Sequence, residues 1–211
     1  MMSRHYRFVG VGQFVVQNDC NGFRDNIRES VLLHLSLFRR ADEGEDIAGS
    51  YLTMLNYQHV FDVFAACEFE LGVELAGCMG GRQEIEREVD HPFDTRFGYT
   101  LKAFLSDDDE GIQKWLPEFK KSCSGNVAGF LPYAEILQAL VDRDASVANE
   151  RFDGLIEGHK RLCKGRGVFP LDIDNELCVL GIGLANLCRW RGIPVEARPP
   201  LIPDALLYQG E

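Results

Sequence analysis

The amino-acid sequence predicts an all-α fold: a single domain over residues 1–211, built as a bundle of antiparallel helical hairpins with a repeat-like character. Apolar residues recur at steps of three and four through most of the chain, the spacing of one helix face. Two segments 36 residues apart resemble each other, as helical-hairpin repeats do. Residues 177–190 are apolar on nearly all sides, which indicates a helix at the centre of the bundle.

The first half of the chain contains one exception to this helical pattern. Residues 6–16 (YRFVGVGQFVV) are rich in aromatic and β-branched side chains and predict a short strand or an extended arm. A helix is expected from residue 21 to about residue 41, because Phe23, Ile27, Val31 and Leu35 share one face. A second helical stretch is expected over 46–79, with a break near 56–59, followed by a charged connection over 82–92.

The internal repeat covers the middle of the chain. Residues 101–108 (LKAFLSDD) align with residues 137–144 (LQALVDRD), and the alignment continues beyond the turn. Each copy indicates a helix, an acidic turn and a second helix, with turn aspartates that cap the second helix. We therefore expect Leu101 and Leu137 at equivalent buried positions of successive hairpins.

Composition and cysteine usage narrow the classes of protein. Hydrophobic residues make up 45% and charged residues 26% of the chain, which excludes wholesale disorder. No apolar run reaches the length of a membrane-spanning helix, and the N-terminal segment lacks the features of a secretory signal. The seven cysteines include no C-x-x-C pair, which favours free thiols in a reducing compartment. These features predict a cytoplasmic protein without a membrane partner.

Acidic residues are concentrated in one part of the chain. The formal net charge is −11, yet residues 42–118 alone carry 18 Asp/Glu against 5 Lys/Arg, a net charge of −13. Such a field disfavours nucleic acid and favours a basic protein partner; a solvated acidic face without a partner is the alternative. The candidate partner-binding residues are the two densest acidic groups: Glu84, Glu86, Glu88, Asp107, Asp108, Asp109 and Glu110.

Motifs that carry chemistry are missing from the sequence. It contains no P-loop, no H-E-x-x-H and no nucleophile elbow, and no two of the five histidines lie within one helical turn. The sequence therefore predicts no catalytic residues, no cofactor and no metal. A Cys–His pair that the fold brings together stays open at this point.

Three segments in the last 80 residues or so carry a resemblance to a known family, with a looser likeness back to Phe93. They are residues 133–144 (YAEILQALVDRD), residues 184–195 (LANLCRWRGIPV) and residues 201–207 (LIPDALL). In these helix ends and prolines the chain resembles bacterial polymorphic-toxin immunity proteins, in particular immunity protein family forty-nine. The resemblance implies an all-α protein that binds and blocks a cognate toxin domain, often a nuclease. It carries over no functional residue.

Three functions from different classes follow as hypotheses. The first is an immunity protein that neutralises a basic, cytoplasm-acting toxin by covering its surface. The alternative is a helical-repeat adaptor that binds a peptide or protein in a concave face. An enzyme with a site assembled from distant residues is the third.

Overall fold

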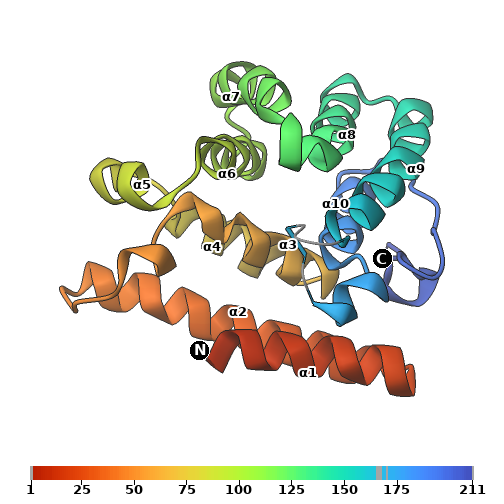
Figure 1. Ribbon diagram of the computed structural model, residues 1–211, viewed down its shortest axis with the longest axis horizontal. Coiled ribbons are helices and arrows are strands. Elements are labelled where there is room, and N and C mark those ends of the chain that lie inside the picture. The colour runs from red at the N-terminus through yellow and green to blue at the C-terminus, as the bar shows by residue number, and fades with distance from the viewer. Residues whose placement is uncertain (1, 165–167, 170, 211) are drawn as a thin grey trace.

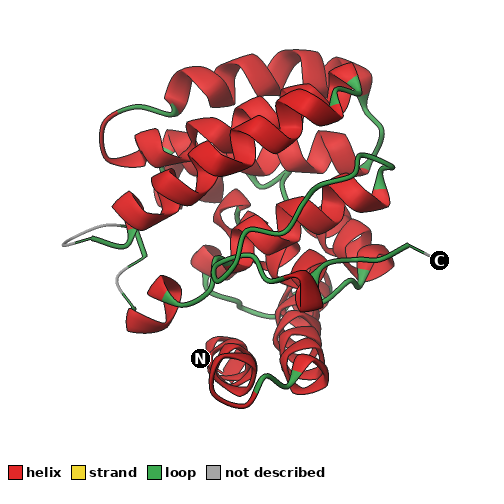
Figure 2. Ribbon diagram, turned by 90° about the vertical axis from the view of Figure 1, so that its right-hand side faces the viewer, coloured by secondary structure: helices red, strands yellow, loops and turns green. Residues whose placement is uncertain are grey.

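The computed structural model describes residues 2–164, 168–169 and 171–210. Within these residues the chain folds into ten α-helices and several short 3₁₀ turns, with no strand and no sheet. Figure 2 shows helices and loops only, and the nearest approach to β structure is an isolated bridge between Arg198 and Ile202. The all-α prediction is confirmed.

Eight of the helices form four antiparallel hairpins that follow one another through the molecule (Figure 1). The first pair lies along one edge, the second pair packs on it, and the third and fourth pairs complete the stack. The pairs are α1 (Met2–Gln17) with α2 (Cys20–Asp42), α3 (Tyr57–Ala65) with α4 (Phe69–Cys78), α6 (Pro92–Leu105) with α7 (Asp109–Ser122), and α8 (Leu131–Asp142) with α9 (Ala145–Leu162). The short helix α5 (Gln83–Val89) lies between the second and third pairs, and α10 (Val179–Trp190) follows the fourth.

All four hairpins turn in the same way. A residue in the left-handed region ends the first helix, and an acidic residue in extended or near-extended conformation then starts the second. This is a helix C-terminus of the Schellman or left-handed type joined directly to an N-cap. The left-handed residues are Asn18, Cys67, Asp107 and Arg143, and they are the only non-glycine residues with positive φ in the described part of the chain.

The internal repeat predicted from the sequence corresponds to the third and fourth hairpins. Leu101 and Leu137 are 1% and 0% exposed, so the expected equivalence is confirmed. Asp108 accepts a hydrogen bond from the Gly111 N–H at 2.9 Å, and Asp144 accepts one from the Val147 N–H at 3.0 Å. The aspartates therefore cap the second helices as predicted.

Helix α10 is the central element. Every residue from Val179 to Cys188 is buried, as its apolar composition predicts. It packs most closely on α3, where a Cβ at position 183 would lie 2.2 Å from the Phe61 carbonyl oxygen. Glycine is therefore required at Gly183, because only a residue without a side chain lets the two backbones approach this closely.

The strand or extended arm expected over residues 6–16 is wrong, because these residues lie in α1. The β-branched residues suggested extended structure, but packing on α2 decides the conformation. Val11 is buried against α2, and Gly10 brings α1 close to the Phe23 carbonyl. Tertiary contacts of this kind routinely override local preference.

Two boundaries in the second quarter of the chain also differ from expectation. The break lies between α3 and α4 at Cys67 and not near residues 56–59, and 3₁₀ turns precede α3. The segment expected as a charged connection over 82–92 contains α5 and the start of α6. Helix α5 is short, and the Glu86 carboxylate accepts the Arg82 N–H at 3.0 Å in a capping arrangement that the sequence analysis did not anticipate.

Candidate functional site

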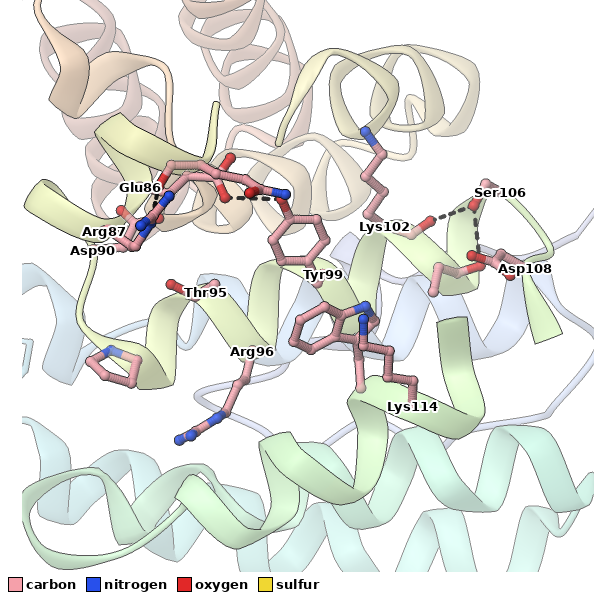
Figure 3. A pocket seen from close by; sticks show the side chains of 14 residues that line it. Glu86, Arg87, Asp90, Thr95, Arg96, Tyr99, Lys102, Ser106, Asp108 and Lys114 are labelled. Carbon is pink, nitrogen blue, oxygen red and sulfur yellow. Dashed lines mark hydrogen bonds between the residues drawn. The ribbon is translucent and has the colours of Figure 1, made fainter. Parts of the chain in front are cut away.

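A groove of about 760 Å³ runs along the outer face of α6, between α5 and the first half of α7 (Figure 3). Its volume lies in the range of sites that hold a drug-sized ligand or a short segment of a partner. Helix α5 supplies one wall, α6 the floor and α7 the other wall. The principal polar and aromatic lining residues are Glu86, Arg87, Asp90, Thr95, Arg96, Tyr99, Lys102, Ser106, Asp108, Lys114 and Trp115.

Two aromatic rings form the middle of the groove. Tyr99 on α6 and Trp115 on α7 stack with ring centroids 4.8 Å apart and an interplanar angle of 15°. The Lys114 ammonium lies 4.4 Å from the Trp115 ring centroid, in cation–π geometry. Both rings are only half-buried, so a flat apolar surface is accessible from the groove.

Hydrogen bonds within the protein hold the carboxylates that line the groove. Glu86, although only 5% exposed, accepts the Tyr99 hydroxyl at 2.9 Å in addition to its bond from Arg82. Burial and the neighbouring Glu86 raise the pKa of Tyr99, so its hydroxyl stays protonated and donates. Asp90 accepts the Met54 N–H at 2.9 Å, and burial raises the pKa of this carboxyl. These carboxylates anchor α5 to the rest of the molecule.

The cations of the groove differ in how far they are engaged. Lys102 donates to the carbonyl oxygens of Gly77 and Met79 at the end of α4, and burial lowers its pKa. In contrast, Arg87, Arg96 and Lys114 form no ion pair with any described carboxylate. The Arg87 Nε donates to the Gln83 carbonyl at 3.1 Å, which leaves its terminal nitrogens available. Positive groups that are available to a ligand therefore lie inside the groove.

The first predicted acidic group divides into a buried and an exposed part. Glu84 and Glu88 are exposed on α5 and pair with no described cation. Glu86 faces the groove instead, where its two oxygens are occupied. Because one turn of a helix separates residues by three to four positions, Glu86 lies on a different face from the other two.

The second predicted acidic group starts α7. All four residues are exposed, but Asp107 pairs with Arg191 at 2.9 Å and Asp108 caps the helix. Asp109 and Glu110 lie in the first turn, where they interact favourably with the helix dipole. The fold thus brings the two acidic groups to one region, since Glu86 and Asp108 line the same groove from opposite ends (Figure 3).

The fold also brings together one Cys–His pair, which the sequence analysis had left open. The Cys163 Sγ lies 3.5 Å from the His159 Nε2, but that nitrogen is 2.7 Å from the Asp174 carbonyl oxygen. A carbonyl only accepts, so Nε2 carries the proton and has no lone pair for the thiol. Burial, together with Asp174, raises the pKa of Cys163 to about 11. The pair therefore lacks the geometry of an activated nucleophile.

The described residues contain neither a metal-binding cluster nor a membrane-spanning helix. No group of three or more His, Cys, Asp and Glu side chains is placed to hold a metal ion. Among the same residues, no helix combines the length and the apolar character needed to cross a bilayer.

Comparisons with known proteins place no further constraint on this site. No protein-family model, curated protein or solved structure matches the chain significantly.

The aromatic and cationic residues of the groove were not predicted from the sequence. One signal was present: Tyr99 lies eight residues before Asp107, and Trp115 lies eight residues after it. In an antiparallel hairpin, positions equally far from the turn face each other, so two aromatic residues in this arrangement are expected to stack. Because the sequence predicts the turn at Asp107, the stacking of Tyr99 on Trp115 could have been predicted from their equal distances to that turn.

Proposed function

We propose that this chain is an immunity protein, which binds a cognate toxin domain in the cytoplasm and neutralises it by covering its basic surface. The observation that carries this proposal is the set of exposed carboxylates around the α6 groove. Glu84 and Glu88 lie on α5, and Asp109 and Glu110 lie at the start of α7; none of the four pairs with a described cation. Charge that folding leaves unpaired is available to a partner of opposite sign.

A nuclease fits this surface well as the toxin. It must present Lys and Arg where it holds phosphates, and an acidic protein that occupies this surface prevents substrate binding. Complementary charge also accelerates association. An inhibitor of this type needs no catalytic group of its own. The helix ends and prolines of the last 80 residues or so suggested the same function from the sequence, although no family model matches the chain.

A helical-repeat adaptor is the second candidate, and one specific observation favours it. Four hairpins turn through the same two-residue junction, and a groove lies over the first helix of the third hairpin. Repeats of helical hairpins use such concave faces to bind peptides. The two functions differ in the partner: a toxin encoded by the adjacent upstream gene supports immunity, and a partner encoded elsewhere supports an adaptor.

The test is co-expression with the product of the adjacent upstream gene, followed by pull-down and binding measurements at about 0.1 M and about 1 M salt, where the Debye length falls from ~10 Å to ~3 Å. Two charge-reversed variants address the surface: Glu84→Lys/Glu88→Lys and Asp109→Lys/Glu110→Lys. Both leave the capping residue Asp108 and the ion-paired Asp107 intact. We expect roughly ten-fold slower association for each variant and a weaker salt dependence.

The control reverses two exposed charges on the remote helix α9, each of which pairs with a neighbouring cation, as Glu150→Lys/Glu157→Lys. This control is expected to bind as the wild type does. If all three variants bind equally well and high salt has no effect, the acidic surface is not the binding surface.

A further inference from the structure

The groove over α6 differs in charge from its surroundings. Each carboxylate that lines it accepts a hydrogen bond from within the protein: Glu86 from Arg82 and Tyr99, Asp90 from Met54, and Asp108 from Gly111. The second oxygen of Asp90 is buried and has no hydrogen-bond partner among the described residues. Glu84, Glu88, Asp109 and Glu110 lie outside it, exposed and without a described cation. The outer surface is therefore acidic, while three cations that line the groove form no ion pair with a described carboxylate.

Three cations supply the positive charge inside the groove. Arg87 belongs to α5, Arg96 to α6 and Lys114 to α7. Figure 3 shows them at separate places around Tyr99, not converging on one point. A compact phosphate needs donors that converge. Dispersed cations suit a ligand whose negative charges are spread along its length.

The aromatic pair adds an apolar requirement. The stacked rings of Tyr99 and Trp115 present a flat surface, and Lys114 covers part of it with a flexible side chain. A carboxylate of a ligand would attract this ammonium away from Trp115, and the ring face would then accept an apolar side chain. A ligand with carboxylates and apolar groups in alternation satisfies both conditions.

We propose that the groove holds an extended segment of the protein partner in which apolar side chains alternate with Asp or Glu, an inference that rests on the proposed function. Groove length favours a peptide, because α6 is 14 residues long and the groove follows it from Pro92 to Ser106. The acidic surroundings disfavour a nucleic acid, because its phosphates would lie against the exposed carboxylates around the groove as well as against the cations inside it. The partner surface is thus basic with an acidic and apolar segment at its centre.

The test uses two capped hexapeptides of equal length, one alternating Phe with Glu and the other alternating Phe with Lys. Each is titrated into the full-length ¹⁵N-labelled protein, and the indole N–H signals of Trp115 and Trp190 are followed. Trp190 stacks on Phe69, away from the groove, and serves as the internal reference. We expect the Glu peptide to shift Trp115 selectively, with a dissociation constant at least ten-fold lower than that of the Lys peptide.

Two variants test the cations. Arg96→Glu removes a groove cation that forms no described ion pair, and we expect it to weaken binding of the Glu peptide at least ten-fold. Arg4→Glu makes the same charge change at an exposed residue in the first turn of α1 and should leave binding unchanged. Equal binding of the two peptides, or equal effects of the two variants, would overturn the inference.

The outcomes separate this inference from the proposed function. If the Glu peptide fails to bind while Glu84→Lys/Glu88→Lys still slows association with the toxin, the groove inference is wrong and the proposed function stands. If the peptide binds to the groove but the toxin is not captured, the proposed function is wrong and the groove is a peptide site of another kind.

Discussion

Four residues form a polar cluster under the first hairpin. The Asp62 carboxylate is fully buried on α3 and accepts bonds from the Arg7 guanidinium at 3.0 Å; His59 lies 3.4 Å away. Burial alone would raise the pKa of Asp62, but Arg7 and His59 outweigh burial and the pKa is lowered. His34 stacks on His59 with ring centroids 4.3 Å apart. This cluster joins α1, α2 and α3, and the charges of its histidine and aspartate side chains depend on pH.

The buried His34 side chain predicts that acid destabilises the protein. Burial, and then the neighbouring His59, lowers the pKa of His34 to about 3 from its ordinary value of 6.5. The unfolded chain therefore binds this proton more readily than the folded one as the pH falls from 6.5 toward 3. Over that window this group lowers the free energy of unfolding by about 1.4 kcal/mol per pH unit. The measurement is urea unfolding at several pH values.

The control for this prediction is His34→Gln, which removes the titrating group. Asp94, whose pKa burial and the neighbouring Asp90 raise to about 6, contributes a slope of the opposite sign near pH 4–6 in both proteins. The difference between wild type and variant cancels this contribution. Parallel stability curves below pH 6 would show that His34 is not the group responsible.

At the scale of the element, the hairpin turn is the repeated unit. In three of the four turns the N–H of the N-cap residue donates to the carbonyl five residues earlier, as in a Schellman motif. These residues are Glu68, Asp108 and Asp144. The left-handed residue before each cap carries a side chain in a conformation that favours glycine.

The turn of the fourth hairpin predicts two opposite changes in stability. Asp144→Ala removes the bond to the Val147 N–H and should cost about 1 kcal/mol of unfolding free energy. Arg143→Gly relieves the left-handed conformation at φ +54° and should stabilise by up to ~1 kcal/mol. Both are measured by urea unfolding. Loss of stability in Arg143→Gly would mean that the side chain of Arg143 contributes more than its strained backbone costs.

Over the whole molecule, Asn186 joins segments that are far apart in the chain. This residue lies in the central helix α10 and is fully buried. Its amide nitrogen donates to the carbonyls of Phe64 and Leu206 at 3.0 and 3.1 Å, and its oxygen accepts the Tyr208 N–H at 2.8 Å. One side chain thus ties the C-terminal segment to α10 and to the end of α3.

Asn186→Leu tests this connection. The substitution keeps the branched shape but leaves the Leu206 carbonyl and the Tyr208 N–H without partners, while the Phe64 carbonyl still accepts the Cys67 N–H at 3.0 Å. We expect a loss of ~2–4 kcal/mol in unfolding free energy. Hydrogen exchange at the Tyr208 amide should accelerate together with this loss. Asn21→Ala, at an exposed position of α2, is the control and should change neither quantity. Unchanged exchange at Tyr208 would show that other contacts hold the C-terminal segment.

The internal repeat predicts two of the four hairpin turns from the sequence. The turns at Asp107 and Arg143 are 36 residues apart, and the sequence predicted both; those at Asn18 and Cys67 went unnoticed. The intervals from Asn18 to Cys67 and from Cys67 to Asp107 are 49 and 40 residues, because 3₁₀ turns and α5 are inserted between hairpins. A search for a constant period finds only the uninterrupted pair.

The sequence by itself determined the all-α class, the capped turns of the third and fourth hairpins and the central place of α10, because each depends on local spacing or composition. The tertiary structure decided the rest. It made residues 6–16 helical by packing them on α2, and it turned Glu86 inward while leaving Glu84 and Glu88 exposed. The groove depends on the tertiary structure more than any other feature, because its walls and floor come from three helices. Only the packing of these helices places Tyr99, Trp115 and the surrounding cations together.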